Sequence, residues 1–385
     1  MTVDKGEKIM KLSCSKAELL EIVNTVQKAV SVKSTMPILE CMLIDSSGDG
    51  NVVVTGNNLD LCIEYNAKMN VPEGGTVALT SKMFGEIVRR LPDGTVTMEV
   101  NPVDNVTKIK CGLSEFNIQG LGGKEYPPAP ILEEKFRFNI AQADLKKLIR
   151  KTISFVAATE GRKPILTGAL FEIKNNHLNV VASDGHRLAV VKHELKENLE
   201  NSKTVIPGTT LRELLKLLKD EEEVTVIVSD RHVMFDFGDF QVYTRKLDGE
   251  FLKYEAILNA VNTINVVCEK KYIIACLERA MLLINDDISA HTENKVPVRF
   301  NMAYNKIDIS CITQKGQVND TVDVELDGGE LLIGFNCRFM LDALTSCDED
   351  KVKMEFSAPT SGCFIHSAGD DDSYIYMVLP VRLYN

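Results

Sequence analysis

Hydrophobic and polar residues alternate along the chain with two different periods, and each period indicates one type of element. Residues 16–30 carry apolar side chains three or four positions apart, at Leu19, Ile22, Val23 and Val26. Such spacing places them on one face of an amphipathic helix. Residues 51–55 and 306–310 instead alternate at every second position, as strands with one buried face do. The pattern predicts an α+β fold in which helices pack on antiparallel sheets.

The same order of elements recurs three times along the chain, with a period of about 128 residues. Alternating segments lie at residues 96–100, 224–228 and 352–356, and Phe116, Phe240 and Phe364 each begin a further strand. The first two copies also share Pro-Ile-Leu, at residues 37–39 and 164–166, in each case 20 residues before a polar residue, Asn57 or Asp184. We therefore expect three similar domains, each built as helix, strands, helix and strands.

The repeat also sets the expected helices and domain boundaries. The first helix of each copy is expected at residues 16–30, 142–156 and 270–284, and the second at residues 81–91, 209–219 and 336–347. Linkers are expected at the proline-rich residues 126–130 and, one period later, at residues 254–261. The expected domains are residues 10–131, 132–260 and 261–385, after a loose tail over residues 1–9.

The cysteine, histidine and apolar residues argue against a disulfide-bonded, metal-binding, membrane-spanning or secreted protein. Ten cysteines are scattered singly, with no Cys-x-x-Cys pair and no histidine at zinc-site spacing. This favours reduced thiols in a cytoplasmic protein without disulfides, metal or another cofactor. The longest apolar runs are too short to cross a bilayer, and residues 1–9 have no apolar stretch that would serve as a secretory signal.

Positive charge is concentrated on the expected helices. The chain has a formal net charge of −11, yet the segments that span the six helices together carry +8, which leaves −19 for the remainder; the segments counted are residues 15–30, 81–91, 141–151, 209–219, 269–285 and 336–347. Charged helix faces are often merely solvated. If the helices line one surface, however, their cations would contact nucleic-acid phosphates without reading bases. The candidate cations are Lys82, Arg89, Arg90, Lys146, Lys147, Arg150, Lys151, Arg212, Lys216 and Lys219.

Five short segments resemble those of one protein family. Residues 183–190, Ser-Asp-Gly-His-Arg-Leu-Ala-Val, are similar to a segment of the bacterial sliding clamps, the beta subunits of DNA polymerase III. Residues 376–383 resemble the closing Pro-x-Arg-Leu signature of that family, and residues 35–39, 55–59 and 90–94 match in order and spacing. The resemblance extends over residues 10–383.

The resemblance implies a processivity factor. Two chains, each of three DNA-clamp domains, would form a head-to-tail homodimer, a ring that encircles double-stranded DNA without sequence preference. The ring would tether the DNA polymerase III alpha subunit, clamp-loader subunits and other proteins with a clamp-binding motif. The dimer contact would join Phe116 and Ile118 to Leu282 and Leu283, although these residues also suit an ordinary core. Lys33 joins Lys82 among the DNA-facing positions.

The resemblance also places a partner-peptide pocket between the second and third domains. Its residues would be Leu166, Ser183, Gly185, His186, Arg187, Leu188, Leu252, Ile257, Met377, Val378, Leu379, Pro380, Val381 and Arg382. Branched and flexible apolar side chains suit an adaptable patch, and we expect Arg187 and Arg382 to orient polar groups of the peptide. Leu252 replaces a proline that is frequent in the family, which leaves the peptide preference open.

Two other functions are less well supported by the residues. Asp184 and His186 would be an acid and base two positions apart, but Ser183 lies in no Gly-x-Ser-x-Gly elbow and no triad is complete. Residues 120–123, Gly-Leu-Gly-Gly, lack the lysine of a phosphate-binding loop. We therefore expect no enzyme activity. The alternative is a repeat scaffold that binds proteins but not DNA, and the helix charge argues against it.

Overall fold

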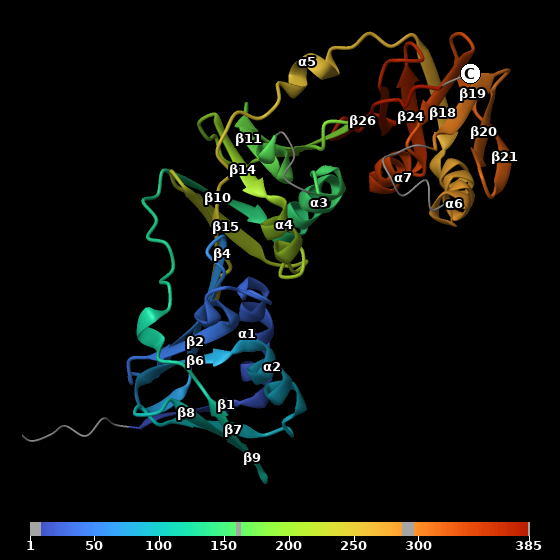
Figure 1. The fold of residues 1–385 in the computed structure, drawn as a ribbon. Coiled ribbons are helices and arrows are strands. Elements are labelled where there is room, and N and C mark those ends of the chain that lie inside the picture. The colour runs from blue at the N-terminus through green and yellow to red at the C-terminus, as the bar shows by residue number, and fades with distance from the viewer. Residues whose placement is uncertain (1–8, 159–162, 287–295, 384–385) are drawn as a thin grey trace, which may run out of the picture. The chain divides into compact units, whose positions relative to one another are not determined.

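A computed structural model describes residues 9–158, 163–286 and 296–383, and two compact units make up the chain (Figure 1). The first unit comprises residues up to Ala143 together with residues 216–246. The second comprises residues 144–215 and all residues from Leu247 onward. The expected tail over residues 1–9 lies, apart from Ile9, outside the described residues. Strands of the expected middle domain contribute to both units, and the three-domain boundaries stay a prediction.

Two antiparallel sheets form the first unit. The five-stranded sheet has the order β5 (Asn70–Glu73), β1 (Met10–Ser15), β7 (Thr95–Val100), β8 (Val106–Cys111) and β9 (Ser114–Gln119). The eight-stranded sheet has the order β10 (Phe136–Ala141), β15 (Glu223–Val228), β16 (His232–Asp236), β17 (Phe240–Arg245), β4 (Leu61–Lys68), β3 (Asn51–Asn57), β2 (Cys41–Ser46) and β6 (Gly75–Thr80). Strand β17 pairs with β4, where the Tyr65 and Phe240 rings stack.

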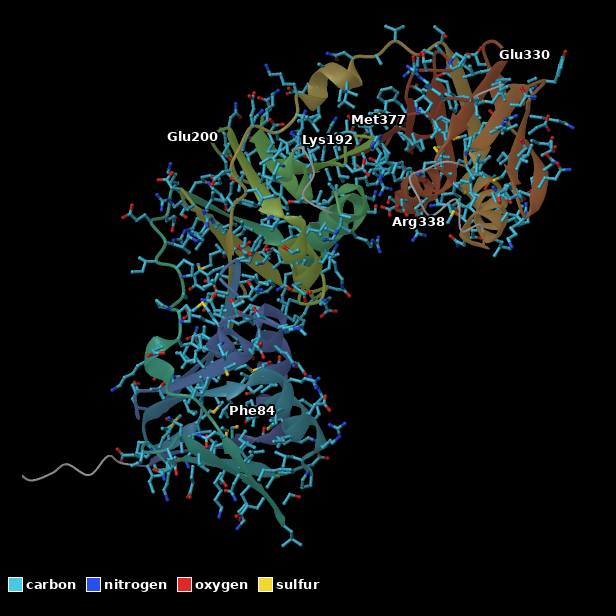
Figure 2. All side chains as sticks on the ribbon, viewed as in Figure 1. Phe84, Lys192, Glu200, Glu330, Arg338 and Met377 are labelled. Carbon is cyan, nitrogen blue, oxygen red and sulfur yellow. The ribbon has the colours of Figure 1, made fainter. Side chains whose placement is uncertain are left out.

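Helices α1 (Lys16–Val26) and α2 (Ser81–Arg90) pack against each other and against these sheets. Helix α1 begins with a capping box: Ser15 Oγ accepts from the Glu18 amide, while Glu18 Oε2 accepts from the Ser15 amide at 3.0 Å. The apolar face expected from the sequence is buried, from Leu19 to Val26. Phe84 lies on α2 (Figure 2) and is fully buried, so it anchors the helix.

Two further antiparallel sheets form the second unit. The nine-stranded sheet has the order β14 (Ser202–Pro207), β11 (Gly168–Lys174), β12 (His177–Ser183), β13 (Arg187–Glu194), β26 (Tyr374–Val378), β25 (Cys363–Ser367), β24 (Lys351–Phe356), β18 (Ile264–Glu269) and β22 (Glu325–Asp327). The four-stranded sheet has the order β21 (Gly316–Asp323), β20 (Lys306–Thr313), β19 (Val298–Ala303) and β23 (Leu331–Phe335). Pairing of β13 with β26 joins the repeats, because these strands come from the expected second and third domains.

The helices follow the expected repeat closely. They are α3 (Gln142–Thr152), α4 (Gly208–Leu214), the short α5 (Tyr254–Leu258), α6 (Lys270–Asp286) and α7 (Cys337–Ser346). Helix α4 ends earlier than predicted, at Leu214, and beyond it the Lys219 amide donates to the Gln142 side chain at 2.8 Å. Helix α5 occupies part of the expected second linker. No helix in the described ranges is long and apolar enough to cross a membrane.

Equivalent turns confirm the repeat at atomic detail. A 3₁₀ turn precedes the hairpin in both copies, at Pro37–Glu40 before β2 and at Pro164–Thr167 before β11. After each hairpin a side-chain oxygen accepts a hydrogen bond from the amide two residues on: Asn57 from Leu59 at 2.8 Å, and Asp184 from His186 at 2.9 Å. The repeat therefore places the Asp184 turn at the end of β12, where the site lies.

Candidate functional site

A cavity of about 690 Å³ opens in the second unit beside the turn between β12 and β13. It is formed by residues 157–158 and 163–166, by the turn itself, by residues 252–257 and by the end of β26. Its lining consists of Ala157, Ala158, Lys163, Leu166, Ser183, Asp184, Gly185, His186, Arg187, Leu252, Ile257, Met377 and Leu379. Nine of the fourteen residues expected from the sequence lie in this lining.

The floor of the cavity is apolar and the rim is partly exposed. Leu166, Phe251 and Met377 belong to one buried core cluster, and Leu252 packs against it. Leu379 and Ile257 at the rim are 39% and 36% exposed. An apolar floor with accessible apolar side chains at the rim suits an apolar ligand group that leaves water.

The other five expected pocket residues do not line the cavity. Leu188 is 1% exposed and Val378 is fully buried, so both serve the core of the nine-stranded sheet, which corrects the expectation that they line the pocket. Pro380, Val381 and Arg382 follow β26, and the Val381 amide donates to the Gly334 carbonyl at 2.8 Å. This segment thus lies along β23, with Arg382 exposed.

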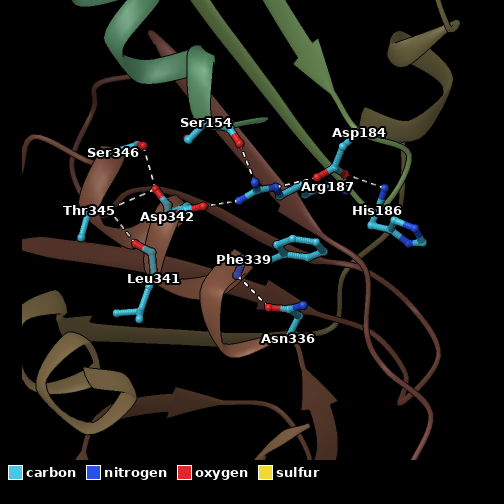
Figure 3. Close-up of polar contacts among 10 residues, drawn as sticks. All are labelled: Ser154, Asp184, His186, Arg187, Asn336, Phe339, Leu341, Asp342, Thr345 and Ser346. Carbon is cyan, nitrogen blue, oxygen red and sulfur yellow. Dashed lines mark hydrogen bonds and ion pairs between the residues drawn. The ribbon is translucent and has the colours of Figure 1, made fainter. Parts of the chain in front are cut away.

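Arg187 is held by partners from three segments of the chain (Figure 3). Its Nε donates to Asp184 Oδ2 at 2.9 Å, its Nη1 to Asp342 Oδ2 at 2.6 Å and its Nη2 to the Ser154 carbonyl at 2.5 Å. The guanidinium carbon also lies 5.1 Å from the centre of the Phe155 ring and 4.3 Å from that of Phe339. The guanidinium thus has internal partners, and the expectation that it orients polar groups of a peptide stays a prediction.

The turn that carries Arg187 is fixed by its own side chains. Ser183 Oγ donates to the Arg187 carbonyl at 2.7 Å and accepts from the Gly185 amide at 3.1 Å. Asp184 Oδ1 accepts from the amides of His186 and Arg187. Gly185 has a φ of +89°, a left-handed conformation that glycine adopts without strain. Ser183 and Asp184 therefore stabilise a turn, which accounts for both residues without catalysis.

Sequence reasoning missed Ala157, Ala158 and Lys163 as lining residues, and it favoured turn and pocket architecture over catalysis for Asp184 without counting that residue among the pocket residues. Two alanines after a helix carry no distinctive pattern, so the sequence offered no signal for them. Asp184 lay inside the motif that was noticed, and its backbone contacts would have been predictable from the tendency of aspartate to cap turns.

Most of the expected DNA-facing cations are on accessible surfaces of their units. Exposed side chains are Lys33, Lys82, Arg89, Arg90, Lys147, Arg150, Arg212, Lys216 and Lys219, while Lys146 is half-buried. Arg89 and Arg90 share Glu86 as a partner on α2. Lys151 is 1% exposed and cannot meet DNA, which corrects its expected role.

Lys151 is buried because an acidic residue and an aromatic ring surround its amine. Its Nζ lies 2.9 Å from Asp348 Oδ2 and 4.1 Å from the centre of the Tyr374 ring. Lys147 Nζ lies 3.0 Å from the same carboxylate oxygen, and Arg150 Nη2 lies 3.7 Å from the other. Burial alone would raise the pKa of Asp348, but the adjacent ammonium groups of Lys151 and Lys147 outweigh burial and hold that pKa below its ordinary value.

The expected dimer residues differ in accessibility. Phe116, on the edge strand β9, is 38% exposed, and Leu282, on α6, is 71% exposed. Ile118 is 8% exposed and belongs mainly to the core of its own sheet, so its expected contact with a second chain is limited. Leu283 is half-buried, near Gly316 at the start of the edge strand β21.

Free thiols do not form a reactive or metal-binding group in the described chain. All ten cysteines are free and nine are buried. Burial raises the pKa of Cys268 to about 12 and that of Cys311 to about 11, which keeps these thiols protonated and unreactive. Within the described ranges, no three His, Cys, Asp or Glu side chains converge as metal ligands would.

Known proteins resemble this chain over nearly its whole length. It is 33% identical over 376 residues to the beta sliding clamp of Halalkalibacterium halodurans, which covers 94% of this chain and 97% of that protein. It is 32% identical over 387 residues to the beta sliding clamp of Bacillus subtilis, with coverage of 97% and 100%.

Solved structures agree with these relatives. The putative DNA polymerase III beta subunit of Eubacterium rectale has a TM-score of 0.91 at 36% identity and covers 97% of this chain and 100% of its own. The sliding clamp of Bacillus subtilis also has a TM-score of 0.91, at 30% identity, with coverage of 98% and 100%.

The three domains of one family match consecutive parts of the chain. The N-terminal domain of the DNA polymerase III beta subunit matches residues 10–130, the central domain residues 139–253 and the C-terminal domain residues 256–382. Together with the relatives and the shared fold, these matches show that the chain belongs to the DNA polymerase III beta subunit family, the bacterial beta sliding clamps.

Proposed function

We propose that this protein is a processivity factor: two copies close head to tail into a ring around duplex DNA and tether the replicative polymerase to it. The observation that carries the proposal is the uninterrupted order of the three family domains over residues 10–382. A clamp needs no reaction centre, and the contacts of Ser183 and Asp184 fit turn architecture. We therefore propose that the protein has no catalytic activity.

Electrostatics support sequence-independent contact with DNA. The chain is acidic overall, with a net charge of −11. Phosphate would therefore be attracted to the cations on the helices and repelled by the rest of the surface. Exposed lysine and arginine side chains such as Lys82, Arg90 and Arg212 contact phosphates by charge and do not distinguish bases. Such contacts weaken as salt rises, because bound counterions are released from DNA. Topology, rather than affinity, would then retain the ring.

The cavity beside the β12–β13 turn is the proposed docking site for partner peptides. Its buried floor and the partly exposed Leu379 and Ile257 offer a few apolar anchors, which is how short linear peptides gain most of their affinity. The partners would be the DNA polymerase III alpha subunit, clamp-loader subunits and other proteins with a clamp-binding motif. Ten free thiols are consistent with the reducing cytoplasm where these proteins act.

Retention on DNA of different topology tests the proposal. The protein is loaded by its clamp loader onto nicked circular DNA at moderate salt, and half of the sample is then linearised with a restriction enzyme. We expect gel filtration to show protein retained on circles and lost from linear DNA. Equal retention on both forms would indicate ordinary site binding. No retention on either form, with peptide binding intact, would support the scaffold that does not bind DNA.

A further inference from the structure

We infer that Asp342 of α7 is a positioning residue for the peptide pocket, acting through Arg187; this inference rests on the proposed function of that pocket. Asp342 does not line the cavity, whereas Arg187 does. The Asp342 carboxylate accepts from Arg187 Nη1 at 2.6 Å, and the two residues lie 155 positions apart in the sequence (Figure 3). The contact therefore ties the β12–β13 turn to a helix of the last repeat.

The turn alone cannot satisfy the Arg187 guanidinium. Asp184 binds Nε, but Nη1 depends on Asp342 and Nη2 on the Ser154 carbonyl. The Arg187 side chain is only 8% exposed, so water replaces a lost partner poorly. A buried charged donor without its partner is costly, and the side chain would move to recover a hydrogen bond.

A shift of Arg187 would also displace Leu379 at the rim of the cavity, because backbone contacts join the two segments. The carbonyl of the preceding residue, His186, accepts from the Leu379 amide at 2.9 Å, and Arg187 pairs with Val378 across the two strands. The His186 ring also stacks on Phe339, with ring centres 6.3 Å apart. Because Phe339 and Asp342 are three positions apart on α7, they share one face of the helix and support the same turn.

The charge of this cluster also limits what the pocket accepts. Two carboxylates, Asp184 and Asp342, surround one guanidinium, so the group formed by these three side chains carries a net charge of −1. The arginine therefore does not attract an acidic residue of a partner. A peptide held here would rely on apolar side chains, and its affinity would change little with salt, in contrast to phosphate contacts on DNA.

The inference is tested by calorimetry with a synthetic peptide taken from the DNA polymerase III alpha subunit of the same organism. Asp342→Asn removes the carboxylate but keeps the backbone carbonyl that accepts from Thr345 and Ser346, so the end of α7 is preserved. We expect a loss of affinity of about tenfold. Asp342→Glu should restore part of it. Asp372→Asn, the same change at a residue that is 95% exposed, is the matched control and should bind as the unchanged protein does.

A double-mutant cycle separates positioning from general stability. In an Arg187→Met background, Asp342→Asn should cause no further loss of affinity, because its effect passes through the arginine. Equal affinity of Asp342→Asn and the unchanged protein overturns the inference, as does an additive loss in the Arg187→Met background. If Arg187→Met does not fold, as judged by circular dichroism, the Asn and Glu variants at position 342 decide alone. Failure of the unchanged protein to bind the peptide would instead refute the proposed docking function.

Discussion

Replacing Asp348 by asparagine removes the carboxylate that neutralises a buried lysine. The Lys151 side chain is 1% exposed and that of Asp348 is 36% exposed, with 2.9 Å between Nζ and Oδ2. Breaking a fully buried pair from one side costs about 3–5 kcal/mol, whereas a surface pair contributes less than about 1 kcal/mol. Because water reaches Asp348 but not Lys151, we expect the free energy of unfolding to fall by about 2 kcal/mol at pH 7.

The effect should depend on pH with a defined sign. The folded-state pKa of Asp348 lies below its ordinary value of 3.8, so the ionised carboxylate stabilises the folded state fully above that value. This contribution is lost as pH falls below 3.8 and through the lowered folded-state pKa. Asparagine does not titrate, so the stability difference between the unchanged protein and Asp348→Asn should shrink over the same range.

Urea unfolding followed by circular dichroism at pH 7 and pH 3 measures this difference, and hydrogen exchange of the α3 amides shows whether the loss is local. Asp372→Asn is the matched control, since Asp372 is 95% exposed and lies 3.7 Å from the accessible Lys192. That control should change the unfolding free energy by less than about 0.5 kcal/mol. The reasoning would be refuted if Asp348→Asn unfolded at the same urea concentration as the unchanged protein at pH 7. It would also be refuted if the difference in unfolding free energy between the two proteins were as large at pH 3 as at pH 7.

Three further outcomes are expected. Leu379→Ala should weaken binding of the polymerase peptide about thirty-fold, or about 2 kcal/mol, in calorimetry. The control Leu332→Ala changes a leucine of similar exposure on β23 and should leave the affinity unchanged. Equal losses of affinity in the two variants would show that the peptide binds elsewhere. Leu282→Asp should give folded monomers in sedimentation, because a charge would be buried at the proposed interface. The control Tyr304→Asp, at an exposed residue, should leave a dimer. Dimers of both variants would show that the interface lies elsewhere. Purified protein should show no nuclease or nucleotide hydrolysis, and any turnover that His186→Ala abolishes would contradict the proposed absence of catalysis.

Local patterns predicted the elements well because local forces form them. The face from Leu19 to Val26 and the capping residues Ser15 and Glu18 lie within a few positions of one another, so the sequence alone locates α1. Strands β7, β15 and β24 formed where alternation and the repeat predicted them. The predicted end of α4 was wrong: the helix stops at Leu214, and the segment that follows it has a hydrogen-bond partner, Gln142, that is 77 positions from Lys219 and cannot be inferred from the local pattern.

The pocket was only partly predictable for a similar reason. The motif around Arg187 and the C-terminal segment identified the right neighbourhood, and nine expected residues line the cavity. Leu188 and Val378 lie in the same motifs but face the core, because strand pairing decides which side chains are buried. Ala157 and Ala158 are recognisable only once the chain brings them beside the turn.

The sequence by itself determined the threefold repeat, the amphipathic helices and the family, since each follows from the spacing of apolar residues or short motifs along the chain. Only the tertiary structure decided which charged side chains remain accessible. Lys151 and Arg187 are as cationic in the sequence as Lys147, yet both are buried against carboxylates of distant segments, Asp348 and Asp342. A charge enters the interior only where an opposite charge compensates for its lost hydration. Folding alone supplies that partner for Lys151, and for Arg187 it adds Asp342 to the sequence neighbour Asp184.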